Sequence, residues 1–169
     1  MRTLGLRSPA VSLIAAALLV LLFAAPAAAD ITGFSGVNST PVRRAVKGVA
    51  VGTGLLIVGF EVEYADTSED LVLGGPRLRT IMFNGLAQTP IPIARMQFYV
   101  TAGAGGYRES FSNEPNGNQT NVGINVGGGA KISLAGPLRL RVDYRVFTLQ
   151  GSPRYKNVQR IYAGINLKF

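Results

Sequence analysis

The feature that most limits how this chain can fold is a strict alternation of apolar and charged side chains in residues 138–146. The apolar members are Leu138, Leu140, Val142, Tyr144 and Val146, and the residues between them are Arg139, Arg141, Asp143 and Arg145. A helix would scatter these charges around its axis, whereas a strand points successive side chains to opposite faces. The segment therefore predicts a β-strand with one charged and one apolar face.

The same alternation recurs along the rest of the chain, most clearly in residues 58–64 and 160–169. Runs with this period, separated by Gly, Pro and Asn, are typical of strands joined by turns. We predict eight strands, at residues 31–37, 46–54, 56–65, 79–88, 95–108, 121–134, 138–149 and 158–169.

The predicted connections are mostly long and short in turn. The long, polar ones are residues 38–45, 66–78, 112–120 and 150–157, and the short ones lie near residue 54 and at 89–94 and 135–137. Outer-membrane barrels have short periplasmic turns and longer external loops, and an even strand number brings both chain ends to the periplasmic side. The predicted fold class is therefore all-β, an eight-stranded antiparallel up-and-down transmembrane β-barrel.

The N-terminus has the pattern of a cleavable signal peptide. Arg2 and Arg7 precede an almost wholly apolar run at residues 11–23, and small residues from Ala27 to Ala29 supply a cleavage site. An uncleaved membrane anchor is the alternative, but the run is shorter than the roughly 20 residues that a spanning helix needs. We predict a signal peptide at residues 1–29 and a barrel at residues 30–169. Export makes nucleic acid an improbable partner, despite 17 Lys and Arg against 9 Asp and Glu.

The charged faces of the strands decide what the barrel interior contains. They carry Glu61, Glu63, Lys131, Arg139, Arg141, Asp143, Arg145, Arg160 and Lys168. The interior of an eight-stranded barrel is filled by side chains, and buried charges must pair. We expect Glu61 and Glu63 to reach Arg139, Arg141 and Arg145, with the excess positive charge met by water, Tyr hydroxyls or ions. This network would plug the lumen.

Two other arrangements fit the same alternation. A soluble periplasmic barrel of the lipocalin kind turns its apolar face inward around a small apolar ligand and its charges to water. A narrow porin-like channel keeps the charges in the lumen but leaves a conducting path. Glycines at positions 103, 105, 127 and 129 either make room for Arg side chains or bend the strands so that the sheet closes.

The C-terminus separates these readings. Tyr162, Gly164, Leu167 and Phe169 resemble the C-terminal assembly signal of bacterial outer-membrane barrels. The chain from residue 30 to residue 169 resembles the small outer-membrane β-barrel superfamily, which includes the transmembrane domains of outer-membrane proteins A and X. Residues 124–147 look like the Gly-rich region of porin-like members. It departs from many members in lacking Trp. The resemblance implies a Gram-negative outer membrane, contact with its lipid, and insertion by the barrel assembly machinery.

No residues in the chain suggest catalysis. His and Cys are absent, so a Ser nucleophile would lack its usual base. Glu61 and Glu63 are better explained as ion-pair partners than as a hydrolytic carboxylate pair. Asp66, Glu69 and Asp70 share one loop, where solvation is favoured over a calcium ion. We therefore predict no catalytic, cofactor-binding or metal-binding residues, and a role in envelope structure or interaction carried by the external loops.

Overall fold

The computed structural model describes residues 28–40, 42–112 and 114–169. The predicted signal peptide, including Ala27 of its cleavage site, lies outside these residues apart from its last two positions. Ala28 and Ala29 begin the first strand, so cleavage after Ala29 would leave Asp30 as the first residue of the sheet. Among the described residues, none form a helix long and apolar enough to cross a membrane.

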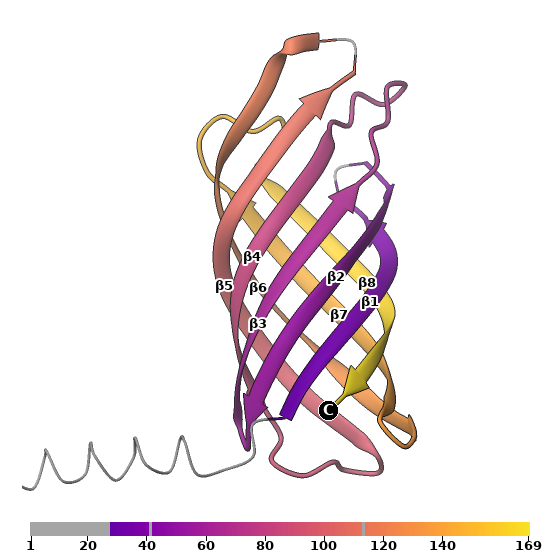
Figure 1. The fold of residues 1–169 in the computed structure, drawn as a ribbon. Coiled ribbons are helices and arrows are strands. Elements are labelled where there is room, and N and C mark those ends of the chain that lie inside the picture. Colours follow the sequence, from indigo (N-terminus) through magenta and orange to yellow (C-terminus); the bar gives the residue numbers. More distant parts are fainter. Residues whose placement is uncertain (1–27, 41, 113) are drawn as a thin grey trace, which may run out of the picture.

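Eight antiparallel strands form a closed barrel in sequence order (Figure 1). They are β1 (Ala28–Asn38), β2 (Arg44–Leu55), β3 (Val58–Thr67), β4 (Arg77–Gln88), β5 (Met96–Phe111), β6 (Glu114–Ala135), β7 (Leu138–Leu149) and β8 (Asn157–Lys168). β8 pairs with β1 from Asp30↔Lys168 to Asn38↔Arg160, which closes the sheet into a barrel. The predicted strand number, order and fold class are confirmed.

The connection between β5 and β6 differs from the predicted polar loop at residues 112–120. Both strands continue past the barrel rim, and only residues 112 and 113 separate them. β6 pairs with β7 from Gly123 onward, so its earlier residues pair with β5 alone and the two strands project as a hairpin (Figure 1). The predicted alternation of loop length also fails here, because residues 89–95 form a longer connection than the turn between β5 and β6. The polar side chains of residues 112–120 indicate exposure to solvent. They do not prevent β-pairing, because the pairing is made by main-chain N–H and C=O groups.

The outer and inner faces of the barrel differ sharply in polarity. Outward side chains such as Phe60, Phe83 and Val100 are 63–64% exposed, while Arg141 and Arg145 on the inner face are fully buried. A lipocalin-like barrel has the reverse arrangement. An apolar exterior around a charged interior is the arrangement that suits surrounding lipid.

The interior also contains two apolar clusters that the charged pattern did not predict. The larger lies towards the end with the projecting hairpin and comprises Leu78, Met82, Tyr107, Phe147, Leu149 and Val158. The second groups Phe34, Val46, Ala50, Ala65 and Tyr162. Within it, Phe34 and Tyr162 stack with ring centroids 4.0 Å apart. A Cβ at Gly48 would lie 2.4 Å from the Phe34 ring, so this packing requires glycine there.

Candidate functional site

The centre of the lumen is organised around Arg145 on β7. Its Nη2 lies 2.8 Å from Glu61 Oε1, its Nε 2.9 Å from Asp143 Oδ1 and its Nη1 3.2 Å from Glu63 Oε2. The three carboxylates have side-chain exposures of 0–1%. Period-2 geometry explains the arrangement, because every second residue of β3 and of β7 points into the lumen from its own wall.

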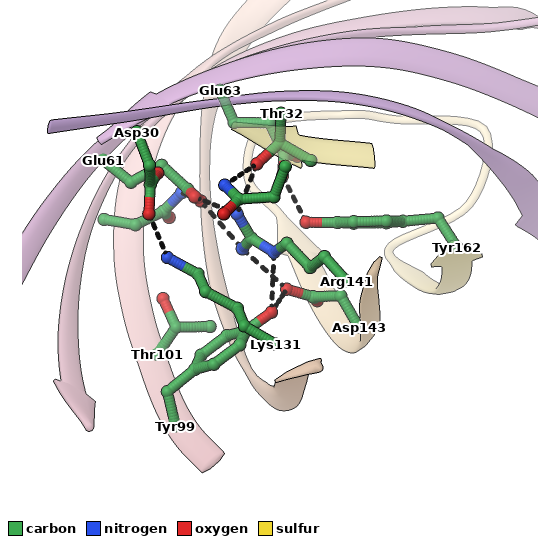
Figure 2. A network of polar contacts seen from close by, with 12 residues as sticks. Asp30, Thr32, Glu61, Glu63, Tyr99, Thr101, Lys131, Arg141, Asp143 and Tyr162 are labelled. Atoms are coloured by element: carbon green, nitrogen blue, oxygen red, sulfur yellow. Dashed lines mark hydrogen bonds and ion pairs between the residues drawn. The ribbon is translucent and has the colours of Figure 1, made fainter. Parts of the chain in front are cut away.

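Arg141 forms the second bridge across the lumen. It bonds Glu61 on β3 through both terminal nitrogens, and its Nη2 lies 2.9 Å from Asp143 Oδ2 (Figure 2). Tyr99 completes this layer: its hydroxyl accepts a hydrogen bond from Arg141 Nε at 2.7 Å and donates to Asp143. Tyr99 is therefore one of the Tyr residues expected to bind the charged side chains of the lumen. It lies on the same face of β5 as Gln97 and Thr101.

A further layer lies towards the hairpin end, around Glu63. Arg160 Nη1 is 3.0 Å from Glu63 Oε1, and the Tyr162 hydroxyl donates to Glu63 Oε2 at 3.1 Å. Arg160 also donates to Asn38 at 3.1 Å and lies 4.3 Å from the centre of the Phe147 ring. The guanidinium is thus held between a carboxylate, an amide and an aromatic face, which together compensate for its burial.

The layer at the opposite end of the barrel, beside the end of β8, contains Asp30. Its Oδ2 bonds Lys131 and lies 2.9 Å from Arg139 Nη2. Arg139 also donates to Asn166 at 2.7 Å. The expectation that Arg139 would reach Glu61 or Glu63 is wrong, because Arg139 lies near the short-turn end of β7 and its nearest carboxylate there is Asp30. No alternating run indicates Asp30, which is the third residue of β1 and directly follows the predicted signal peptide.

Lys168 is the one predicted network residue that is exposed and forms no ion pair among the described residues. It lies at the end of β8, where it lines a hollow beside Asp30, Lys131 and Arg139. The other eight residues are all buried on the inner face, with side chains that take part in ion pairs among the residues described. Polar alternation identifies the face of a residue but cannot show whether the residue lies within the barrel's height.

Solved structures with the same architecture show the fold to which this barrel belongs. The N-terminal β-barrel domain of Pseudomonas aeruginosa OprF matches with a TM-score of 0.65 at 16% identity, covering 84% of this chain and 97% of that one. Neisserial surface protein A matches with a TM-score of 0.63 at 18% identity, covering 85% and 96%. The chain has the fold of the small outer-membrane β-barrels. No protein-family model and no curated protein sequence matches it.

The small outer-membrane barrel fold does not by itself exclude catalysis. The outer membrane enzyme PagL also matches, with a TM-score of 0.52 at 10% identity, covering 82% of this chain and 98% of that one. Whether the present barrel is an enzyme is therefore decided by its own side chains rather than by its fold.

The glycines of this outer-membrane-type barrel allow neighbouring strands to approach closely. A Cβ at Gly127 would lie 2.2 Å from Tyr144 O and 2.8 Å from Arg145 Cγ, so this glycine serves both of the expected purposes. At Gly103 and Gly105 the first obstacles are Asn84 and the backbone of Ile81. These two glycines let β5 approach β4 closely and do not make room for Arg side chains.

The four residues of the predicted assembly signal divide between the two faces of β8. Tyr162 and Gly164 face the lumen, where Gly164 lies against Phe34: an added Cβ would be 2.7 Å from Phe34 Cβ. Leu167 and Phe169 are exposed, by 37% and 75%. Packing against Phe34 thus explains why Tyr162 and Gly164 occupy these two inward positions. Recognition of the four residues by an assembly machinery remains a prediction.

Of the three acidic residues predicted to share a loop, Asp66 lies in β3, and only Glu69 and Asp70 lie in the connection that follows. Each of the three is bound by the protein itself. Asp66 pairs with Arg77, and Asp70 accepts backbone N–H bonds from Val72 and Leu73 at 3.1 and 3.0 Å. Ser112 donates its hydroxyl and its N–H to Glu69, which holds the pKa of that carboxyl below its ordinary value. Within residues 28–40, 42–112 and 114–169, no His, Cys, Asp and Glu side chains gather as a metal site would require.

Proposed function

We propose that this chain is a non-enzymatic integral outer-membrane protein whose closed barrel is a rigid support for external loops. Those loops would act in envelope structure or interaction. The observation that carries the proposal is the reversal of polarity across the barrel wall. Exposed Phe60, Phe83 and Val100 form part of an apolar exterior, while buried charges occupy the inside. Such a molecule is stable where lipid surrounds it, and its exterior would associate non-specifically in water.

The density of ion pairs supports a plugged lumen rather than a narrow channel. The buried carboxylates Asp30, Glu61, Glu63 and Asp143 are interleaved with Lys131, Arg139, Arg141, Arg145 and Arg160. A hollow of about 40 Å³ lies beside Asp30 and Lys131 near the periplasmic end. That volume holds a water molecule or two, and the layers above it are filled by guanidinium groups and the larger apolar cluster.

The binding of the carboxylates supports a role without catalysis. Glu61 and Glu63 are each bound by two arginines across the lumen. A hydrolytic carboxylate pair needs access to substrate and water. These two groups instead face a filled interior, so their chemistry is used in stabilising the barrel.

The proposal is tested by carbonate extraction of isolated outer membranes, followed by gel electrophoresis in SDS with and without boiling. We expect the protein to stay with the membrane pellet and to migrate differently after boiling, because a closed barrel resists SDS until it is heated. Recovery in the soluble periplasmic fraction without a heat-dependent shift would instead support the lipocalin-like alternative. Protein sequencing of the mature N-terminus would test the export prediction, with Asp30 as the expected first residue.

A further inference from the structure

A row of cationic side chains crosses the outside of the barrel just below its external rim. The ladder registers align Lys47 on β2 with Asp66 on β3, Asp66 with Arg79 on β4, and Arg79 with Arg108 on β5. These positions alternate with inward-facing residues, so all of them point away from the lumen. Arg77, two residues from Arg79, faces outward as well and is 43% exposed.

Negative charge in this row is scarce. Asp66 is its single carboxylate: Arg77 bonds it closely, and Arg79 Nε lies 3.7 Å away. Arg108 and Lys47 form no ion pair with any residue that the structure describes. Four cations therefore surround the one carboxylate of this row, and Glu69 in the connection after β3 also attracts Arg77. The lumen network does not neutralise this surface.

An apolar row lies directly beneath, one pleat repeat nearer the middle of the barrel. The registers align Tyr64 with Ile81, Ile81 with Gly106, and Gly106 with Val122. Tyr64, Ile81 and Val122 are 41–54% exposed. Gly106 leaves the row without a side chain at its centre, and a groove of about 340 Å³ opens there, lined among others by Tyr64, Ile81, Arg79 and Arg108.

Gly106 is unlike the glycines that the barrel needs for closure. An added Cβ would find only Asn121 O, at 4.0 Å. A side chain at this position would therefore fit without strain, and its absence has the effect of opening the groove on the outer surface.

We propose that this groove binds an acylated, phosphate-bearing lipid of the outer leaflet, with phosphates on Arg79, Arg108 and their cationic neighbours and an acyl chain over Gly106. The order of the two rows matches the order of a lipid, because cations at headgroup height attract anionic headgroups while apolar residues below meet the chains. From Lys47 to Arg108 the row crosses four strands, roughly 14 Å at the usual strand spacing. That width favours a broad headgroup with more than one phosphate.

The inference depends on the proposed function, because it places the external rim of the barrel in a membrane. The test uses the folded chain in a non-ionic detergent, with binding of diphosphoryl lipid A followed by native mass spectrometry. The charge variant is R79Q/R108Q, and its control K156Q/K168Q removes two exposed cations elsewhere on the chain. The groove variant is Gly106→Phe, and its control is Gly33→Phe, at an outward glycine where an added Cβ meets nothing within 4 Å.

We expect R79Q/R108Q to weaken lipid binding about 30-fold, from the usual contribution of two arginines near an anionic surface. We expect Gly106→Phe to weaken it at least several-fold with the charge unchanged, and both control variants to bind as the parent does. The monophosphoryl form should bind less tightly than the diphosphoryl form, and millimolar inorganic phosphate should not displace either.

Three results would overturn the inference. One is equal weakening by R79Q/R108Q and K156Q/K168Q, which would indicate attraction by net charge alone. Another is unchanged binding in Gly106→Phe, which would show that the groove does not hold the acyl chain. The third is displacement by inorganic phosphate, which would indicate an ion site without a role for acyl chains. A heat-dependent gel shift of every variant separates these outcomes from loss of the barrel itself.

Discussion

At the scale of single residues, the lumen depends most on Arg145. It forms ion pairs with Glu61, Glu63 and Asp143, and all four side chains are at most 1% exposed. A buried pair that is replaced by apolar groups on both sides is often tolerated, but removal of one partner leaves the other charge without compensation. Loss of Arg145 is therefore expected to be costly, because three buried carboxylates would lose an ion-pair partner together.

We predict that Arg145→Met lowers the free energy of unfolding by about 3–5 kcal/mol, the usual cost of leaving buried charges unpaired. Urea titration in detergent micelles, followed by the heat-dependent gel shift, measures the change. Lys168→Met is the matched control and should lie within about 0.5 kcal/mol of the parent, since Lys168 is exposed. A loss in Arg145→Met no larger than in the control would contradict a structural role for the network.

At the scale of the strands, β6 is shaped by its neighbours' backbones as much as by its own sequence. A Cβ at Gly129 would lie 2.2 Å from Val142 O and 2.5 Å from the Tyr99 hydroxyl. The first obstacle belongs to the partner strand and the second to the ion-paired layer. The absence of a side chain at this position thus allows both the close pairing of β6 with β7 and the position of Tyr99 in the lumen.

We predict that Gly129→Ala destabilises the barrel by about 1–3 kcal/mol, the range typical of overpacking a filled interior. Gly33→Ala should leave stability nearly unchanged, because no atom lies within 4 Å of its added Cβ. The folded fraction after dilution from urea into detergent measures both variants. Equal yields would show that the sheet relaxes around the extra methyl group.

The β5–β6 hairpin allows the orientation of the strands to be tested directly. An epitope tag inserted after Ser112, in the projecting turn, should be bound by antibody on intact cells. The same tag inserted after Gly136, in the turn between β6 and β7, should be bound only after the outer membrane is permeabilised. The reverse pattern would show that the barrel is inserted the other way round.

At the scale of the whole molecule, the sequence predicts the strands better than it predicts the interior. Alternation in residues 138–146 identifies β7 and the faces of Arg141 and Arg145, because period 2 is a local property. Asp30 could not be assigned in this way, since its partners Lys131 and Arg139 are distant in the chain and meet it only through closure. The inner apolar clusters do not follow from the alternation, because an inward Leu or Phe looks the same in sequence as an outward one.

We predict that the purified barrel gives no stepwise single-channel currents in a planar lipid bilayer. Arg141, Arg160 and the larger apolar cluster are buried inside the barrel, so we expect no continuous path for a hydrated ion. A 16-stranded porin, whose interior is aqueous, is the positive control in the same bilayer. Reproducible small steps that scale with protein concentration would favour the narrow-channel alternative.

The pairing of β1 with β8 also has a consequence for the timing of biogenesis. Asp30 cannot meet its ladder partner Lys168 until the ribosome has made nearly all of the described chain. During that interval β1 has at most one of its two neighbours, and a strand with an open edge invites wrong pairing. Closure is therefore a late event that can follow only once β8 has been made. If the chain is exported as proposed, it would have to cross the inner membrane before it acquires the closed shape.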